Sequence, residues 1–190
     1  MIQLLYSDHL PTRQPQHSII EFNLNDKNMV KIGLQISAIL ENVSEFLSEG
    51  DDFRWYLKFK CSSCGEISCT WQYICANEST DTKGGRGSAN MVQKCKMCGR
   101  ENHMDIIKDK IKSYTNDDSG SFVTIISFEC RGMEPVEFDF RNGWKVNSSC
   151  SNTVFSDVDL SETEWYDYDD TANESVSITE LQSNFVKLKK

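Results

Sequence analysis

The chain has 190 residues, of which 38% are hydrophobic, and it carries a formal net charge of −9 with a pI near 4.8. The length suits one domain with a sizeable core, although the low hydrophobic content predicts that segments at the ends stay outside it. An acidic chain repels phosphate backbones, so we expect no nucleic acid as a partner. We also expect no membrane as a partner.

Residues 1–28 differ from the rest of the chain. They contain two of the three prolines and two of the three histidines, and they show little periodicity. We expect a disordered extension over 1–28 and one zinc-binding β domain over 29–190. A targeting peptide is the alternative, but a transit peptide is rich in arginine and poor in acidic residues, whereas this segment has one arginine beside three acidic residues.

Apolar side chains alternate with a period of two over much of the chain after residue 28, which predicts β-strands. The first strand is expected over 32–40 and the second over 53–59, where it runs straight into a cysteine pair. Alternation resumes over 69–75 and again over 89–95, which leads into another cysteine pair. We therefore expect each cysteine pair at the tip of a hairpin.

The later part of the chain continues the same pattern, with strands expected over 122–130, 136–140 and 176–186. The segment 104–111 fits either a strand or a short helix, and its strand-rich surroundings favour the strand. No helical stretch is long enough for a crossover connection. The elements therefore predict an all-β fold, with antiparallel sheets packed face to face as a single sandwich-like domain.

Two Cys-x-x-Cys-Gly segments, at 61–65 and 95–99, predict a metal centre. Two thiolates of one tight turn reach the same ion, and the glycine takes the positive φ that points backbone N–H groups at the sulfurs. Four thiolates fill a tetrahedral zinc site and leave no position for an activated water, so the ion is structural. We predict one Zn²⁺ per chain, with the ligands Cys61, Cys64, Cys95 and Cys98. The gap between the pairs is long enough to hold a further hairpin.

Two other interpretations of the cysteines stay open. Eight cysteines could form four disulfides in a secreted chain, and a lone Cys-x-x-Cys pair could do redox work. The chain length and the missing export signal argue against disulfides, and no helical pattern follows either pair, as a thioredoxin-type site requires. We expect Cys69, Cys75 and Cys130 to be small core residues on strands, and Cys150 to tolerate substitution.

Residues 151–186 contain nine acidic residues and no Lys or Arg, which equals the whole formal net charge. A solvated surface explains such a stretch, and a site for a basic partner is the alternative. Within it, the run 165–170 (Trp-Tyr-Asp-Tyr-Asp-Asp) suits packing against the fold or docking a partner. Cations near the cysteine pairs are expected to offset the negative charge of a zinc tetrathiolate: Lys60, Lys94, Lys96 and Arg100.

The sequence offers no catalytic constellation. His103 is the only histidine after residue 28, and no base is paired with a nucleophile or an oxyanion donor. A surface position for His103 is favoured over a role as a donor to the metal site. The glycine-rich run 84–88 lacks the ending of a phosphate-binding loop and is expected to be a flexible turn. We therefore expect no enzymatic activity.

Seven segments of the chain resemble the eukaryotic CXXC-motif-containing zinc-binding protein family, long catalogued only as a domain of unknown function. The segments are 52–61, 71–74, 83–95, 128–136, 155–160, 165–170 and 174–176, and the resemblance spans about 29–186. It implies a single β-sheet domain with zinc held by Cys61, Cys64, Cys95 and Cys98, and no established enzymatic activity. Members begin close to residue 31 of this chain, so 1–28 resembles an addition, and the alternative is an upstream stretch that is translated only in the gene model.

The expected function is that of a non-catalytic zinc-binding protein whose structural four-cysteine site supports a protein-interaction module. Its partner would be a protein, the chain a monomer, and its compartment the cytoplasm, with the nucleus as the alternative. The competing hypothesis is a metal-handling or thiol-exchange factor whose four-cysteine site releases or exchanges its ion. In that case Cys69 or Cys75 would take part.

Overall fold

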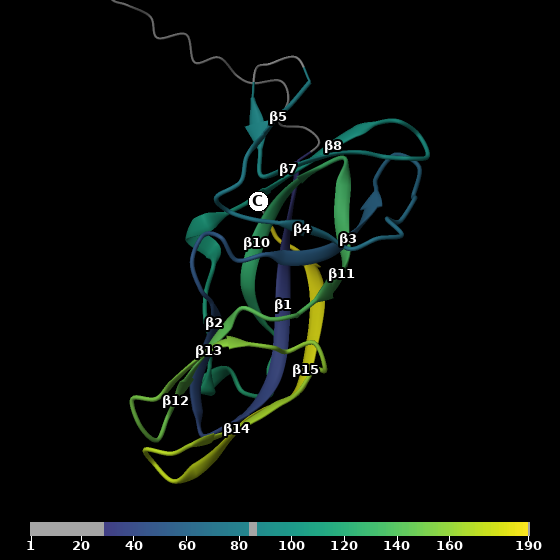
Figure 1. Cartoon of the computed structure of the whole chain (residues 1–190). Coiled ribbons are helices and arrows are strands. Elements are labelled where there is room, and N and C mark those ends of the chain that lie inside the picture. Colours follow the sequence, from purple (N-terminus) through teal and green to yellow (C-terminus); the bar gives the residue numbers. More distant parts are fainter. Residues whose placement is uncertain (1–28, 84–86, 190) are drawn as a thin grey trace, which may run out of the picture.

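The computed structural model describes residues 29–83 and 87–189, which are almost entirely β-strands (Figure 1). Every named pair of strands is antiparallel, which confirms the predicted all-β fold. In these two ranges no helix is long and apolar enough to span a membrane. The extension predicted over 1–28 and the turn predicted around 84–86 lie outside the described residues.

One long sheet of six strands forms the first layer. Its central strand alternates as the sequence predicts, with Ile32, Leu34 and Ile36 buried on one face and Ile39 exposed on the other. The order of strands across the sheet is β14 (Trp165–Asp169), β15 (Glu174–Lys187), β1 (Met29–Glu41), β10 (Val123–Arg131), β8 (Glu101–Ile106) and β7 (Met91–Lys94).

Two smaller sheets make up the second layer, and they share one continuous hydrophobic core with the long sheet. The upper small sheet has the order β11 (Met133–Asp139), β3 (Trp55–Cys61) and β4 (Gln72–Ile74). The lower small sheet has the order β13 (Val154–Val158), β12 (Trp144–Ser148), β2 (Val43–Ser48) and β9 (Tyr114–Thr115). A short hairpin, β5 (Thr80–Asp81) with β6 (Ser88–Ala89), lies between the two cysteine pairs, as predicted.

An aromatic cluster centred on Trp144 joins the two small sheets. The Trp144 ring lies 4.9 Å from that of Phe53, 5.8 Å from that of Trp55 and 5.6 Å from that of Phe46, measured between centroids. Its buried indole N–H donates to the Phe140 carbonyl oxygen at 2.8 Å. Trp144 belongs to β12 and Trp55 to β3, so their edge-to-face contact fastens one sheet to the other.

Two of the predicted strands differ from the structure in their bounds or their register. β8 ends at Ile106, and the 3₁₀ turn Lys108–Lys110 follows, so the segment 104–111 combines both of its expected conformations. The pairing of β11 with β3 shifts register between Pro135 and Glu137, which turns Val136 outward instead of into the core. The alternation of apolar and polar residues in the sequence predicts neither the 3₁₀ turn nor the bulge.

The cysteines outside the two pairs behave differently from one another. Cys130 is buried on β10, and Cys75 is buried just after β4, where its thiol donates to the Asn77 side-chain oxygen at 2.9 Å. Cys69 is exposed and lies outside any strand, so its prediction as a core residue is wrong. The strand predicted over 69–75 contracts to β4, because only its last part pairs with β3.

The acidic run 165–170 divides into packed and exposed side chains. Asp169 is fully buried, and its carboxylate accepts hydrogen bonds from the hydroxyls of Ser151 at 2.6 Å and Thr153 at 2.8 Å. The backbone N–H groups of Thr171 and Ala172 also donate to it. These bonds tie the β14–β15 hairpin to the turn between β12 and β13. Asp169 is therefore a structural residue rather than part of a docking site.

Replacing Asp169 by Asn tests this role through pH. The hydroxyls of Ser148, Ser151 and Thr153 lower the pKa of Asp169 below its usual range. A depressed folded pKa stabilises the fold above the unfolded pKa of about 3.9 and loses that contribution as the pH falls below it. Asp169→Asn should therefore lower the free energy of unfolding at pH 7, and the difference from wild type should shrink below about pH 4.

Denaturant unfolding as a function of pH makes this measurement. The exposed Asp170 offers a matched control, since Asp170→Asn should leave the pH profile unchanged. A constant difference between Asp169→Asn and wild type at every pH would contradict the assignment.

Candidate metal centre

The first cysteine turn begins where β3 ends. Cys61 is the last residue of that strand, and its backbone N–H donates to the Glu66 carbonyl at 2.8 Å, while the Gly65 N–H returns to the Cys61 carbonyl at 2.9 Å. Gly65 takes a φ of +79°, which closes the turn at little steric cost only for glycine. The turn presents Cys61 and Cys64 on one side.

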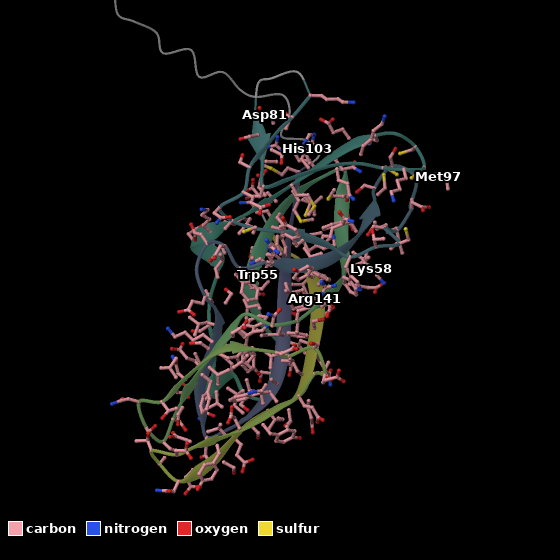
Figure 2. The ribbon with its side chains drawn as sticks, in the orientation of Figure 1. Trp55, Lys58, Asp81, Met97, His103 and Arg141 are labelled. Atoms are coloured by element: carbon pink, nitrogen blue, oxygen red, sulfur yellow. The ribbon has the colours of Figure 1, made fainter. Side chains whose placement is uncertain are left out.

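The second cysteine turn connects β7 to β8 and repeats the same bonding pattern. The Cys95 N–H donates to the Arg100 carbonyl at 2.8 Å, the Gly99 N–H donates to the Cys95 carbonyl at 3.0 Å, and Gly99 has a φ of +72°. Met97 projects from the tip of this turn and is 70% exposed (Figure 2). The prediction that each cysteine pair lies at a hairpin tip is confirmed.

The two turns bring their four sulfur atoms together, although they belong to different sheets. The Sγ atoms of Cys61 and Cys98 are 3.8 Å apart, those of Cys64 and Cys95 are 3.6 Å apart, and all four lie within 4.8 Å of one another. Zn–S bonds of about 2.3 Å in a tetrahedron require S···S separations of about 3.8 Å. The donor set and its spacing therefore fit one zinc ion.

Backbone donors prepare two of the thiols for ionisation. The N–H of Cys64 is the main cause that lowers the pKa of Cys61 to about 6, and the N–H of Cys98 is the main cause that lowers the pKa of Cys95. The first cysteine of each pair thus receives the N–H of the second, as the turn geometry requires. Both thiols are thereby favoured as thiolates.

The Cys64 thiol does not ionise as readily as those of Cys61 and Cys95. The Glu66 N–H lowers the pKa of Cys64, but desolvation and the sulfurs of Cys95, Cys98 and Cys61 outweigh it and raise that pKa to about 12. Adjacent thiolates repel one another, so the cluster ionises fully only when a positive ion lies between the sulfurs. A divalent ion of soft character meets this requirement.

Four cations lie close to the cysteine pairs in the sequence. They are exposed, and none forms an ion pair in the part of the chain that the structure describes. Each is therefore free to offset the negative charge of a metal tetrathiolate. They are Lys60, Lys94, Lys96 and Arg100.

His103 does not join the cluster. Its Nε2 lies 3.9 Å from a Glu101 carboxylate oxygen, and its side chain is 23% exposed, so the expected surface position is only partly met. Within residues 29–83 and 87–189, the four cysteines are the one group of at least three Cys, His, Asp or Glu side chains that could hold a metal ion. Figure 2 shows where Met97 and His103 lie on the ribbon.

Asn102 is a residue of the site that the sequence analysis missed. It is 3% exposed, and its side-chain N–H points to the Cys61 sulfur at 3.8 Å, so it links β8 to the opposite cysteine turn. Gly132 (φ +80°) lies against it, and a Cβ atom there would clash with the Asn102 side-chain oxygen. An Asn on a strand carries no sequence signal for such a contact, which depends on two segments meeting.

The fold and the site together define an all-β, zinc-binding type of protein with a four-cysteine centre. The model of the family described as "CXXC motif containing zinc binding protein, eukaryotic" matches residues 33–186. Relatives with that name are 55% identical in Mus musculus and 53% identical in Homo sapiens, each over 84% of this chain and 99% of the relative. The chain belongs to this family, which confirms the resemblance seen in the sequence.

Two solved structures are similar to this one. The crystal structure of C1orf123 has a TM-score of 0.79 and 52% identity, covering 83% of this chain and 99% of that one. A hypothetical protein from Plasmodium falciparum has a TM-score of 0.74 at 23% identity, covering 82% and 99%, and thus shares the fold.

Replacing one cysteine of the cluster should remove the metal and loosen the fold. A hydroxyl is a much weaker zinc ligand than a thiolate, so Cys95→Ser should reduce bound zinc well below one ion per chain and destabilise the domain by several kcal/mol. Elemental analysis and thermal unfolding measure both effects. The exposed Cys150 gives the control, and Cys150→Ser should match wild type in both. Wild-type zinc content in Cys95→Ser would contradict the four-sulfur assignment.

Removing the Asn102 amide should weaken zinc binding without removing a ligand. Hydrogen bonds to metal-ligating groups typically contribute a factor of about 10 to 100 in metal affinity, so Asn102→Leu should raise the zinc dissociation constant by about tenfold. Competition with a colorimetric chelator measures this constant. Asn147 is the control, because its side-chain oxygen, like that of Asn102, is buried and has no hydrogen-bond partner among the described residues. It lies on β12, at the far end of the fold. Asn147→Leu should leave zinc affinity unchanged, and equal losses in both variants would indicate a merely structural effect.

Proposed function

We propose that this protein is a non-catalytic, zinc-stabilised module that binds another protein, with Cys61, Cys64, Cys95 and Cys98 as the zinc ligands. The observation that carries the proposal is the closed cluster of four sulfurs. Four thiolates complete the tetrahedron, so no coordination position remains for a water or substrate. The ion then acts through structure alone.

The placement of the two turns supports a structural role for the ion. Cys61 and Cys64 extend from β3 in the upper small sheet, whereas Cys95 and Cys98 join β7 to β8 in the long sheet. An ion bound to both pairs clamps one layer to the other at this end of the sandwich. Its binding free energy would therefore be folding free energy.

The lack of a catalytic constellation agrees with this proposal. The single histidine of the described chain lies beside Glu101 and outside hydrogen-bonding distance of it, with no nucleophile paired to it. We place the protein in the cytoplasm, or alternatively the nucleus, as a monomer with a protein partner. The family names given above concern zinc and identify no substrate, which leaves a binding role as the best supported function.

A metal-handling or thiol-exchange factor is the second candidate. In its favour, Cys64 and Cys98 are exposed, so a competing ligand could reach the ion. A pocket of about 60 Å³ beside the sulfurs is also lined by Cys61, Cys95 and the exposed Cys69. A thiol at that pocket could enter the coordination sphere as another leaves.

Chelator challenge separates the two candidates. For a structural ion, zinc release and loss of the β-sheet circular dichroism signal should follow the same time course, because the ion leaves only when its end of the fold opens. For an exchange factor, zinc should leave rapidly while the strands stay intact, and Cys69→Ser should slow the release. Rapid release with a native spectrum would overturn the structural proposal.

A further inference from the structure

The outer face of the long sheet carries two uncovered tyrosines at the end opposite the cysteine cluster. Tyr166 and Tyr168 lie on the edge strand β14 and are 64% and 50% exposed. Figure 1 places β14 at the bottom of the molecule, whereas β7, β8 and the upper small sheet lie toward the top. Glu164 and Asp170 fall at the same alternate positions, and these four residues are called the tyrosine face below.

The neighbours of the tyrosine face leave its rings bare. In the register of β14 with β15, Tyr166 lies opposite Ser177 and Tyr168 opposite Ser175. Serine side chains are too short to cover a phenol ring, which agrees with the exposure of both tyrosines. Large exposed aromatic side chains of this kind are the residues that most often anchor protein interfaces.

The same strand is held rigidly from its other face. Trp165 packs edge-to-face on Phe155 of β13, with ring centroids 5.1 Å apart, and the buried Asp169 binds the turn between β12 and β13. The tyrosines are therefore presented by a fixed strand rather than by a loop. A surface that is already ordered loses less conformational entropy when a partner binds.

The charges around the tyrosine face have no partners of opposite sign within 29–83 and 87–189. Eight of the nine carboxylates between residues 151 and 186 are exposed, and none forms an ion pair among the described residues. Elsewhere exposed acids such as Asp51 and Glu137 do pair with lysines at 2.8 Å. The uncompensated field here complements a cationic partner.

The strand edge itself is protected against pairing with another strand. The Asp167 carboxylate accepts the Tyr168 backbone N–H at 2.8 Å, which occupies a donor that an added strand would need. A partner is therefore expected to contact the side chains of the tyrosine face rather than extend the sheet. Ammonium or guanidinium groups suit the tyrosine face, because such cations bind to carboxylates and also to the faces of phenol rings.

We propose that the tyrosine face docks a segment of a partner protein rich in Lys or Arg, whose cations stack on Tyr166 and Tyr168 and pair with Glu164 and Asp170. The proposal rests on the interaction role given above and names the surface and the chemistry of the partner. It makes the two ends of the molecule functionally separate, since the metal centre contributes no atom to this surface.

The test uses the zinc-loaded protein and a short synthetic peptide that alternates Lys with Val, with a second peptide carrying Glu in place of Lys. Amide NMR titration should show shifts centred on 164–170 and 175–179 with the lysine peptide alone. The double variant Tyr166→Ala/Tyr168→Ala should weaken binding about tenfold, as expected for two exposed cation–π contacts. Tyr73, an exposed tyrosine of the upper small sheet, is the matched control, and Tyr73→Ala should bind like wild type.

Four outcomes would overturn the proposal. Binding that survives the loss of both tyrosines and responds only to salt would show non-specific charge attraction. Shifts centred on Tyr73, or no shifts with either peptide, would show that the tyrosine face is not the docking site. The structural role of zinc would still be decided separately by the chelator experiment. A change of oligomeric state in the double variant, measured by light scattering, would instead assign the face to a second copy of the chain.

Discussion

Four sulfurs from two different sheets must meet at one point, and this constraint organises the upper half of the molecule. Cys61 and Cys64 sit at the end of β3, and Cys95 and Cys98 sit between β7 and β8. Each turn needs its own glycine and its own pair of strands to aim the thiols. The strands that carry the turns also contribute to the core, so the sulfur cluster and the sandwich are built on the same strands.

The lower half is built by other means. Trp144 packs against aromatic side chains from both small sheets, and Asp169 ties the last hairpin to the β12–β13 turn through hydroxyl and backbone donors. Neither contact involves sulfur. The molecule thus combines an end that carries the four-cysteine cluster with an end stabilised by aromatic packing and a buried carboxylate, joined by the long strands β1, β10 and β15.

Features that depend on residues close together in the sequence could be predicted, whereas features that depend on residues far apart could not. Strand alternation and the Cys-x-x-Cys-Gly spacing are local, so the face of β1 and the two cysteine turns could be predicted. Val136 turns outward because of a bulge, Cys69 is exposed because the segment 69–71 before β4 is not part of a strand, and Asn102 meets Cys61 across the fold. Those three outcomes depend on residues distant in the chain, which periodicity does not encode.

The register of β1 has a consequence for how the chain is made. Gly33 pairs with Val186 on one side and with Ser127 on the other, so both neighbours of the first strand arrive late in synthesis. An apolar strand must therefore wait, unpaired, while most of the chain emerges from the ribosome. Pairing between strands so distant in the chain is slow. Until β15 has emerged from the ribosome, β1 keeps an unpaired apolar edge that chaperones can bind and that can misassemble with other chains.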